Sequence, residues 1–223
     1  MAEPLIVDGG MLDAELEKLM KFSSLMDELK RLERYKGQYY WRDYPQPARY
    51  ESVADHSWRL ALLVMLLERK LSRRMDLNKA LKMALIHDIP EVIAGDESPL
   101  GEDGTGKSTH AFNKEAKEAR HESEKRAAKR VFDMLPKEEG KELLGLWLEY
   151  ERQECFEARV VKALDRIEAF LHVLKERNGK MFPKHIEFST NYSLQLADVD
   201  PEIQKFGEQI AREMKDNYEE FKK

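Results

Sequence analysis

The segment from Ala84 to Val92 constrains the fold more than any other part of this 223-residue chain. Its apolar, helix-forming residues end at an adjacent histidine and aspartate, His87 and Asp88, and Pro90 prevents the helix from continuing straight. Because neighbouring residues on a helix point about 100° apart, these two side chains can hold one ion only if it lies beyond the helix face. Other helices must then supply further ligands.

Most of the chain is expected to be helical. Apolar residues recur at helical intervals, whereas the alternating pattern of strands is almost absent. The expected helices cover about 11–35, 52–67, 78–88, 113–134, 136–150, 156–177 and 201–221. The first of them is expected to pack on a core, and the expected loops cover 38–50, 97–110 and 181–199. The fold class is therefore predicted to be all-α.

Composition excludes several classes of protein. A formal charge of −5 and a pI near 5.8 argue against a nucleic-acid-binding protein with a general basic surface, although a local cationic pocket is compatible with them. The single cysteine, Cys155, is expected to start a helix; it excludes an intramolecular disulfide and fits a reducing compartment. No apolar run approaches the roughly 18 residues that span a bilayer, and the acidic N-terminus does not resemble a signal peptide. We expect a cytoplasmic protein that binds neither membrane nor nucleic acid.

A second candidate ligand, His56, lies in the first turn of a predicted helix. Ser52 and Asp55 have the spacing of a capping box, in which each side chain accepts a hydrogen bond from the backbone of the other residue. The helix that follows is almost wholly apolar, which indicates a central element. It would bring a second imidazole towards the core of the bundle.

A third candidate, Asp165, lies on the flank of the apolar stripe of the helix at 156–177. A carboxylate in such a position requires a partner. The residues alone leave two alternatives open. Asp165 either pairs with a nearby arginine such as Arg159 or Arg166, or it contacts the same ion as the two histidines.

Two further features of the chain are weaker signals. Residues 101–108 have the spacing of a Walker A motif, but turn-forming residues precede them where a P-loop requires a strand, so a flexible loop is expected. His110 and His121 accompany Lys114 and Lys117 in a strongly charged region. They could approach a phosphate or a second ion, although such side chains are more often solvated.

Four of these residues carry a resemblance to a known family. The order of His56, the His87-Asp88 pair and Asp165 resembles the H…HD…D signature of the HD-domain metal-dependent phosphohydrolases. The resemblance implies an all-α HD-domain helical bundle in which these four residues bind one divalent transition-metal ion. Two imidazoles and two carboxylates suit Mn²⁺, Co²⁺, Fe²⁺, Ni²⁺ or Zn²⁺, and affinity order alone does not select among them.

Three segments narrow the resemblance to one branch of the family. Residues 51–57, 87–96 and 162–165 are similar to the branch of the 5′-deoxynucleotidases and the HD-domain-containing protein 2 group. This similarity implies hydrolysis of the 5′-phosphate of (deoxy)nucleoside monophosphates, and we expect a homodimer. The alternatives are a hydrolase of another nucleotide, such as a triphosphate, cyclic nucleotide or alarmone, and a metal-stabilised interaction protein without activity.

The resemblance also implies roles around the metal. Glu91 is expected to act in acid–base catalysis beside the ligand Asp88, with the orientation of a ligand histidine as its alternative role. The expected substrate-binding residues are Asp96 for a sugar hydroxyl, Arg42 or Arg49 for the phosphate, and Trp41 for the sugar. Trp41 would crowd a 2′-hydroxyl, which favours deoxyribose.

The chain is interpreted as a single HD domain that covers residues 1–223, because it contains neither an internal repeat nor a second domain. Its metal-site core is expected at about 15–177. The loop and helix at 178–223 are expected to be appended to that core.

Overall fold

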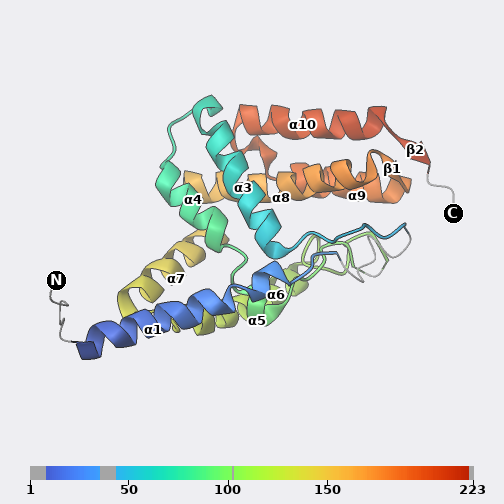
Figure 1. Cartoon of the computed structure of the whole chain (residues 1–223). Coiled ribbons are helices and arrows are strands. Elements are labelled where there is room, and N and C mark those ends of the chain that lie inside the picture. The colour runs from blue at the N-terminus through green and yellow to red at the C-terminus, as the bar shows by residue number, and fades with distance from the viewer. Residues whose placement is uncertain (1–8, 36–43, 102, 221–223) are drawn as a thin grey trace, which may run out of the picture.

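The computed structural model describes residues 9–35, 44–101 and 103–220, and Figure 1 shows a bundle of helices. The α-helices are α1 (Gly9–Leu25), α3 (Val53–Leu67), α4 (Leu77–Ile86), α5 (Glu91–Ala94), α6 (Lys114–Phe132), α7 (Lys137–Arg152), α8 (Phe156–Arg177), α9 (Pro183–Leu194) and α10 (Pro201–Asp216). The 3-10 helices are η1 (Glu28–Lys30), η2 (Glu68–Lys70) and η3 (Ala197–Val199). Two short strands, β1 (Lys180–Met181) and β2 (Glu219–Glu220), pair in parallel. The all-α prediction is confirmed.

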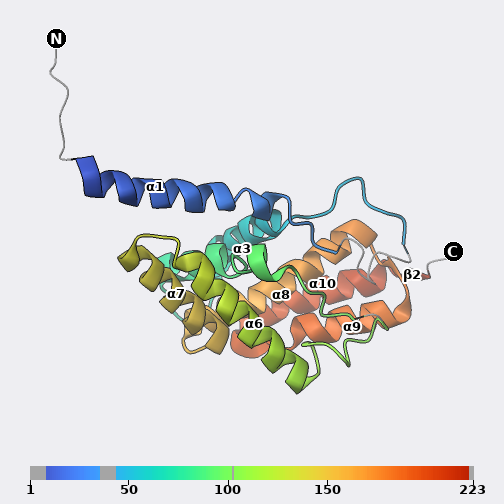
Figure 2. The ribbon, with the colours of Figure 1, turned by 90° about the horizontal axis from the view of Figure 1, so that it is seen from below.

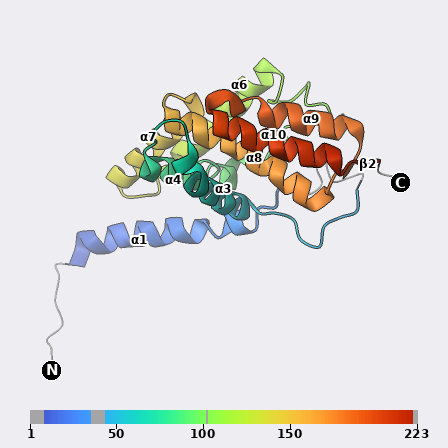
Figure 3. The same ribbon diagram turned by 90° about the horizontal axis from the view of Figure 1, so that it is seen from above.

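The long helix α8 is the central element of the bundle. It packs against α3, α4 and α7 on one side and against α9 and α10 on the other (Figures 1 and 3). The Cys155 sulfur caps its first turn by accepting a hydrogen bond from the Ala158 N–H, and the helix ends where Asn178 and Gly179 adopt positive φ angles of 46° and 81°. These bounds agree with the sequence prediction.

The candidate histidines lie at the start of α3 and at the end of α4, and both of these helix ends agree with the sequence prediction. The Ser52 hydroxyl accepts from the Asp55 N–H at 3.1 Å while Asp55 accepts from the Ser52 N–H at 2.8 Å, which completes the capping box at the start of α3. His87 caps the end of α4. Pro90 then precedes the short helix α5, so the chain changes direction immediately after Asp88.

The core consists of two apolar clusters. The larger cluster lies mainly between α3, α4, α8, α9 and α10. The smaller is formed by Leu29, Val53, Ile86, Ile89, Ala128, Val131, Phe132, Leu135 and Trp147. Both α3 and α4 contribute to both clusters, so their histidines lie at the boundary between them.

The C-terminal part of the chain differs from the prediction. Residues 181–199 were expected to form a loop, but they contain α9, which starts with Pro183 in its first turn. The buried face of α9 carries His185, Ser189 and Ser193 beside Phe188, so it lacks the apolar periodicity that identifies a helix. The predicted helix at 201–221 ends at Asp216 instead, before β2.

Helix α1 lies along one side of the bundle and extends beyond it (Figures 2 and 3). Its residues Leu16, Leu19 and Met20 are exposed by 51%, 41% and 70%, whereas Phe22 and Leu25 near its end pack against the smaller cluster. The prediction that this helix packs on a core is therefore wrong as far as Met20, because the apolar side chains at 16, 19 and 20 have no cover within the described chain.

The Walker-like segment does not have the surroundings of a P-loop. Within the described part of the chain, the only strands pair at 180–181 and 219–220, and the helix after the segment begins at Lys114. The segment is held by Leu100, which is fully buried and accepts a hydrogen bond from the Gly106 N–H at 2.8 Å. Leu100 also lines the cavity described below, whereas the described residues of the segment itself do not.

Every helix among the described residues is too short or too polar to cross a lipid bilayer. This finding agrees with the lack of long apolar runs in the sequence. The expected cytoplasmic location stays a prediction.

Two glycines in α7 provide a test of the packing. A Cβ added to Gly140 would lie 2.4 Å from the carbonyl oxygen of Phe132, whereas a Cβ at Gly145 would meet no atom within 4 Å. We expect Gly140→Ala to lower the free energy of unfolding by about 1–3 kcal/mol, because the backbone must shift. Gly145→Ala should raise it by up to about 1 kcal/mol, because alanine favours a helix.

Denaturant titration of both variants measures these changes. A Gly140→Ala protein as stable as Gly145→Ala would contradict the close packing of α7 against the end of α6.

Candidate metal centre and catalytic cavity

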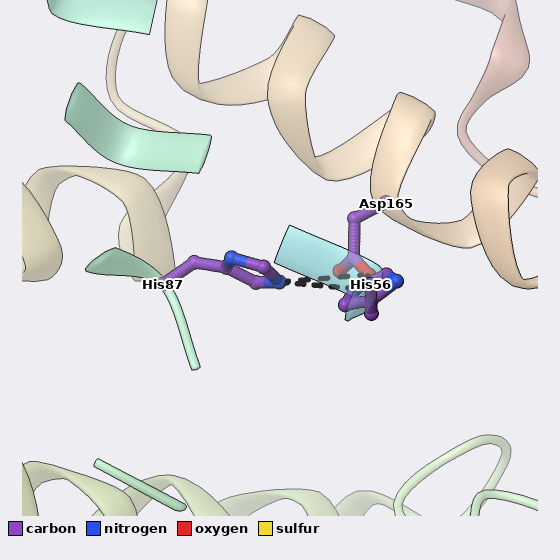
Figure 4. A group of neighbouring side chains, drawn as sticks. All are labelled: His56, His87 and Asp165. Carbon is purple, nitrogen blue, oxygen red and sulfur yellow. Dashed lines mark hydrogen bonds and ion pairs between the residues drawn. The ribbon is translucent and has the colours of Figure 1, made fainter. Parts of the chain in front are cut away.

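Three helices bring the four candidate ligands together. His56 comes from the first turn of α3, His87 and Asp88 from the end of α4, and Asp165 from the middle of α8; Figure 4 shows His56, His87 and Asp165. The His56 Nε2 atom lies 3.3 Å from His87 Nε2 and 3.1 Å from Asp165 Oδ1. Asp88 Oδ2 lies 3.1 Å from His87 Nε2 and 3.7 Å from His56 Nε2.

These separations fit a metal ion. Nitrogen and oxygen ligands lie about 2.0–2.2 Å from a transition-metal ion, so neighbouring ligand atoms in tetrahedral or octahedral sites are about 3.0–3.5 Å apart. His56, His87 and Asp165 each present one atom within 4.8 Å of the other two. The residues present therefore fit the ion that the sequence predicts.

The two imidazoles are oriented by contacts on the opposite side of each ring. His56 Nδ1 forms a short hydrogen bond with the Glu168 carboxylate, and both side chains are fully buried. His87 Nδ1 lies 2.9 Å from the carbonyl oxygen of Ala84, which can only accept, so this nitrogen carries a proton. Both rings thus direct Nε2 towards the shared site, as partners of metal-binding histidines commonly do.

Asp165 has partners other than the arginines considered from the sequence. Its Oδ2 accepts a hydrogen bond from the Tyr150 hydroxyl at 3.0 Å and lies 3.7 Å from Lys162 Nζ. Its Oδ1 is left for His56 and the shared site. Neither Arg159 nor Arg166 pairs with it, so the alternative of a simple salt bridge to an arginine is wrong.

The local field favours a positive charge at this centre. Burial alone would lower the pKa of His56, but the Glu168 and Asp165 carboxylates outweigh it and raise that pKa to about 10. The pKa values of both aspartates lie well below the usual range despite their burial, chiefly because of His87 for Asp88 and because of His56 and Lys162 for Asp165. A divalent ion would replace the proton, because metal binding and protonation compete for the same lone pair.

Glu168 belongs to a buried ion-pair cluster beneath His56. Arg59 Nε donates to Glu168 at 2.5 Å, and Glu51 accepts from Arg34 at 3.0 Å and from Arg59 at 3.1 Å. Glu51, His56 and Glu168 also have the spacing of a metal site. Because two arginines already occupy the carboxylates, this group is a support for His56.

Glu91 is buried beside the centre with one oxygen unpaired. Its Oε1 lies 3.6 Å from Arg120 Nη2, whereas Oε2 is buried and has no hydrogen-bond partner among the described residues. Burial and the nearby Asp88 and Asp96 carboxylates raise the pKa of Glu91 well above its usual range, although Arg120 opposes this effect. A carboxyl group in this state can donate a proton.

A cavity opens from the metal centre. Asp88, Asp165, Glu91 and Asp96 line it together with residues from three further segments, namely Arg34 and Tyr35 before α3, Ser98 and Leu100 after α5, and Phe188 and Ser189 of α9. Two of the predicted ligands, Asp88 and Asp165, therefore share one cavity with the predicted acid–base residue and the predicted sugar-binding residue.

The remaining predicted residues lie elsewhere. Arg49 is 70% exposed and pairs with Asp55 at 2.8 Å, in a separate hollow with Trp58, Arg59 and His172. Trp41 and Arg42 lie outside the described residues. The roles of these three side chains in substrate binding stay predictions.

Several site residues were missed by sequence reasoning. Glu168 could have been recognised, because it lies one helical turn after Asp165 and on the buried side of α8. The contacts of Arg120 with Glu91 and of Tyr150 with Asp165 join separate helices, and no local pattern indicates them. Trp147 likewise donates to the His87 carbonyl oxygen at 2.9 Å from α7.

The chain is similar to several known proteins. A family model described as the HD domain matches residues 26–206. The 5′-deoxynucleotidase HDDC2 of Xenopus laevis is 34% identical over 171 residues, which cover 77% of this chain and 75% of that protein. The 5′-deoxynucleotidase HDDC2 of Homo sapiens is 35% identical over 153 residues, 69% of this chain and 65% of that protein.

The fold of this chain is also similar to that of a solved structure. The crystal structure of a predicted metal-dependent phosphohydrolase from Magnetospirillum magnetotacticum MS-1 superposes with a TM-score of 0.72 at 26% identity. The match covers 93% of this chain and 96% of that chain. It therefore extends over the helices that follow residue 178 as well as over the metal centre.

The contact between Glu168 and His56 can be tested through the affinity for metal. Glu168→Gln removes the charge that holds the His56 ring, so the dissociation constant for Mn²⁺ or Co²⁺ should rise about ten- to hundredfold. Competition with a chelator of known affinity measures this constant. Glu176→Gln is the matched control, because Glu176 is an exposed residue on the same helix. Equal affinities in the two variants would contradict the proposed support.

Proposed function

Because this chain belongs to the HD-domain family, we propose that it is a metal-dependent phosphohydrolase of the 5′-deoxynucleotidase type. The substrate is a deoxynucleoside 5′-monophosphate, and the products are a nucleoside and inorganic phosphate. The similarity to 5′-deoxynucleotidases of other organisms supports this activity. The observation that carries the proposal is the convergence of His56, His87 and Asp165 beside a cavity that Asp165 lines together with Glu91 and Asp96.

His56, His87, Asp88 and Asp165 are the proposed ligands of one divalent transition-metal ion. When bound, such an ion supplies a water molecule of lowered pKa and offsets the charge that develops on the phosphate. Lys162 holds the ligand Asp165 in position, and Glu168 holds the ligand His56. Asp88 lies nearest to Glu91 in the chain and helps to keep it protonated.

Glu91 is the proposed acid–base residue. Glu91 lines the same cavity as the ligands Asp88 and Asp165, and its Oε2 atom is buried and unpaired within the described chain. Its raised pKa favours the protonated form. A protonated Glu91 would donate its proton to the sugar oxygen that leaves, which avoids the release of an alkoxide. The alternative role, in which Glu91 orients a ligand histidine, is less favoured because both histidines have other partners on Nδ1.

Asp96 is the proposed contact for a sugar hydroxyl. It follows Gly95, whose φ of 80° turns the chain back after α5, and it lines the cavity near Arg34 and Glu91. A carboxylate that accepts from a hydroxyl is a charge-assisted hydrogen bond and contributes about 1.5–3 kcal/mol. Trp41 beside the sugar stays the proposed source of the preference for deoxyribose.

The proposed assembly is a homodimer. Helix α3 exposes Trp58, Leu62, Met65 and Leu66 at helical spacing, with Trp58 exposed by 65%. Helix α1, which extends beyond the bundle (Figure 2), exposes a further set of apolar side chains. Apolar surfaces of this kind are commonly covered by a partner, and a second copy of the chain is the partner expected from the sequence.

A substrate panel tests the proposed activity. With added Mn²⁺ or Co²⁺, we expect inorganic phosphate to be released from deoxynucleoside 5′-monophosphates, with higher kcat/KM than for the matched ribonucleotides. Asp96→Asn should lower kcat/KM about tenfold to hundredfold because one charge-assisted hydrogen bond is weakened, while metal content is retained.

The other outcomes of the panel have distinct meanings. Release of pyrophosphate or tripolyphosphate would indicate a hydrolase of other nucleotides. A metal-loaded protein that hydrolyses none of the substrates would indicate an interaction protein. Equal rates for deoxyribose and ribose substrates would remove the proposed sugar preference.

A further inference from the structure

Two hollows meet beside the metal centre. The first is the cavity that contains Asp88 and Asp165, and the second opens towards α6 and the end of α7. The residues that line both hollows are His110, Arg120, Lys162, Arg166 and Tyr192. We call the first four of these the cationic corner. Of these four, the sequence singles out only His110 as a side chain that could approach a phosphate, although such a side chain is more often solvated.

His110 presents a buried donor without a partner. An Arg120 Nη1–H group donates to His110 Nε2, so that nitrogen is the acceptor and Nδ1 carries the ring proton. Burial and the neighbouring Arg120 lower the pKa of His110 to about 3, which keeps the ring neutral. The Nδ1–H group is buried and has no hydrogen-bond partner among the described residues.

Arg166 presents a second such donor. Its Nη1 atom donates to the Gln195 side chain at 2.6 Å, and its guanidinium lies 4.3 Å from the centre of the Tyr192 ring. These contacts fix the plane of the group. Its Nε–H is buried and unpaired within the described chain. Buried donors without partners are rare in folded proteins and indicate a missing acceptor.

The corner is linked directly to the metal centre. Lys162 Nζ lies 3.7 Å from Asp165 Oδ2, and Arg120 Nη2 lies 3.6 Å from Glu91 Oε1. Glu124 and Glu151 on the outer side neutralise part of this charge, at 2.6 Å from Arg120 and 3.4 Å from Lys162. The chemistry that would satisfy two unpaired N–H donors beside two cations is that of an oxyanion.

The cavity also has a direction along α8. Lys162 and Arg166 lie at its charged end, whereas Phe170 and Val173 continue the lining one and two turns further along the helix. Asp96 acts electrostatically on Arg34 and Tyr35, and Tyr35 stacks on His172 near the same apolar end. An anionic group at one end and a nucleoside at the other would match this arrangement.

We propose that the cationic corner binds the oxygens of the substrate's 5′-phosphate that do not contact the metal ion. His110 and Arg166 donate through Nδ1 and Nε, and Arg120 and Lys162 supply the charge. The inference rests on the proposed function, since it assigns the phosphate of a nucleoside monophosphate to this position. These residues position the phosphate, and the nucleoside extends along α8 towards Phe170.

Binding of inorganic phosphate to the metal-loaded full chain, measured by calorimetry, tests the corner without turnover. Arg166→Gln and His110→Phe should each raise the dissociation constant for phosphate about tenfold or more, because each removes a donor to a charged acceptor. Both should raise KM for a deoxynucleoside monophosphate by a similar factor. The dissociation constant for the corresponding deoxynucleoside, which has no phosphate, should change by less than about twofold, because no donor of the corner contacts the nucleoside.

Two further variants separate positioning from general effects. His110→Asn should restore phosphate binding, because its amide N–H can replace Nδ1–H. Lys117→Gln is the charge control, because Lys117 lines only the outer hollow; it should leave phosphate binding within about twofold, since an exposed charge is strongly screened. Metal content and the free energy of unfolding are measured for each variant. If a substitution at position 110 or 166 impairs folding, the variant at the other position still tests the proposal.

Two outcomes of these binding measurements would overturn the proposal, and a third would contradict the proposed function alone. Wild-type affinity for phosphate in both Arg166→Gln and His110→Phe would overturn the proposal. So would a loss of affinity that is confined to nucleoside di- and triphosphates, because the corner would then bind a second phosphate. A wild type that binds phosphate at the corner but hydrolyses no monophosphate would contradict the proposed function while supporting the anion site itself.

Discussion

The contact between Glu168 and His56 is the interaction on which the candidate site depends. Both side chains are fully buried, and Arg59 and Arg34 surround the carboxylate. Burying such charges costs several kcal/mol per ion unless each is paired, so the cluster is stable only as a unit. The cluster holds the His56 ring so that Nε2 faces the shared site. Carboxylates outnumber cations at that site, which leaves an excess of negative charge.

This excess of negative charge is one half of a separation of charge within the cavity. Carboxylates gather around the ligand atoms and Glu91, whereas cationic groups gather at the adjoining corner. A divalent ion would offset the first group, and a phosphate dianion would offset the second. The two ions would also attract each other. The centre is thus suited to bind metal and phosphate together, more than to bind either one alone.

Much of this arrangement was accessible from the sequence. The capping residues Ser52 and Cys155 and the turn at Asn178 define helices whose bounds depend on local chemistry, and these predictions are confirmed. Helix α9 was missed because serine and histidine occupy its buried face, which covers a polar cavity and not a purely apolar core. The contacts between Arg120 and Glu91 join distant segments, and a single sequence contains no signal for them.

All of these proposals require that α3, α4 and α8 together form one metal site. The most direct measurement is a titration of metal-free protein with Co²⁺, followed by its visible absorption, in the wild type and in His87→Ala and Asp165→Ala. We expect one Co²⁺ to bind per wild-type chain, with the spectrum of mixed nitrogen and oxygen ligands, and this spectrum to be lost in both variants. An unchanged spectrum and stoichiometry in His87→Ala and Asp165→Ala would contradict this expectation.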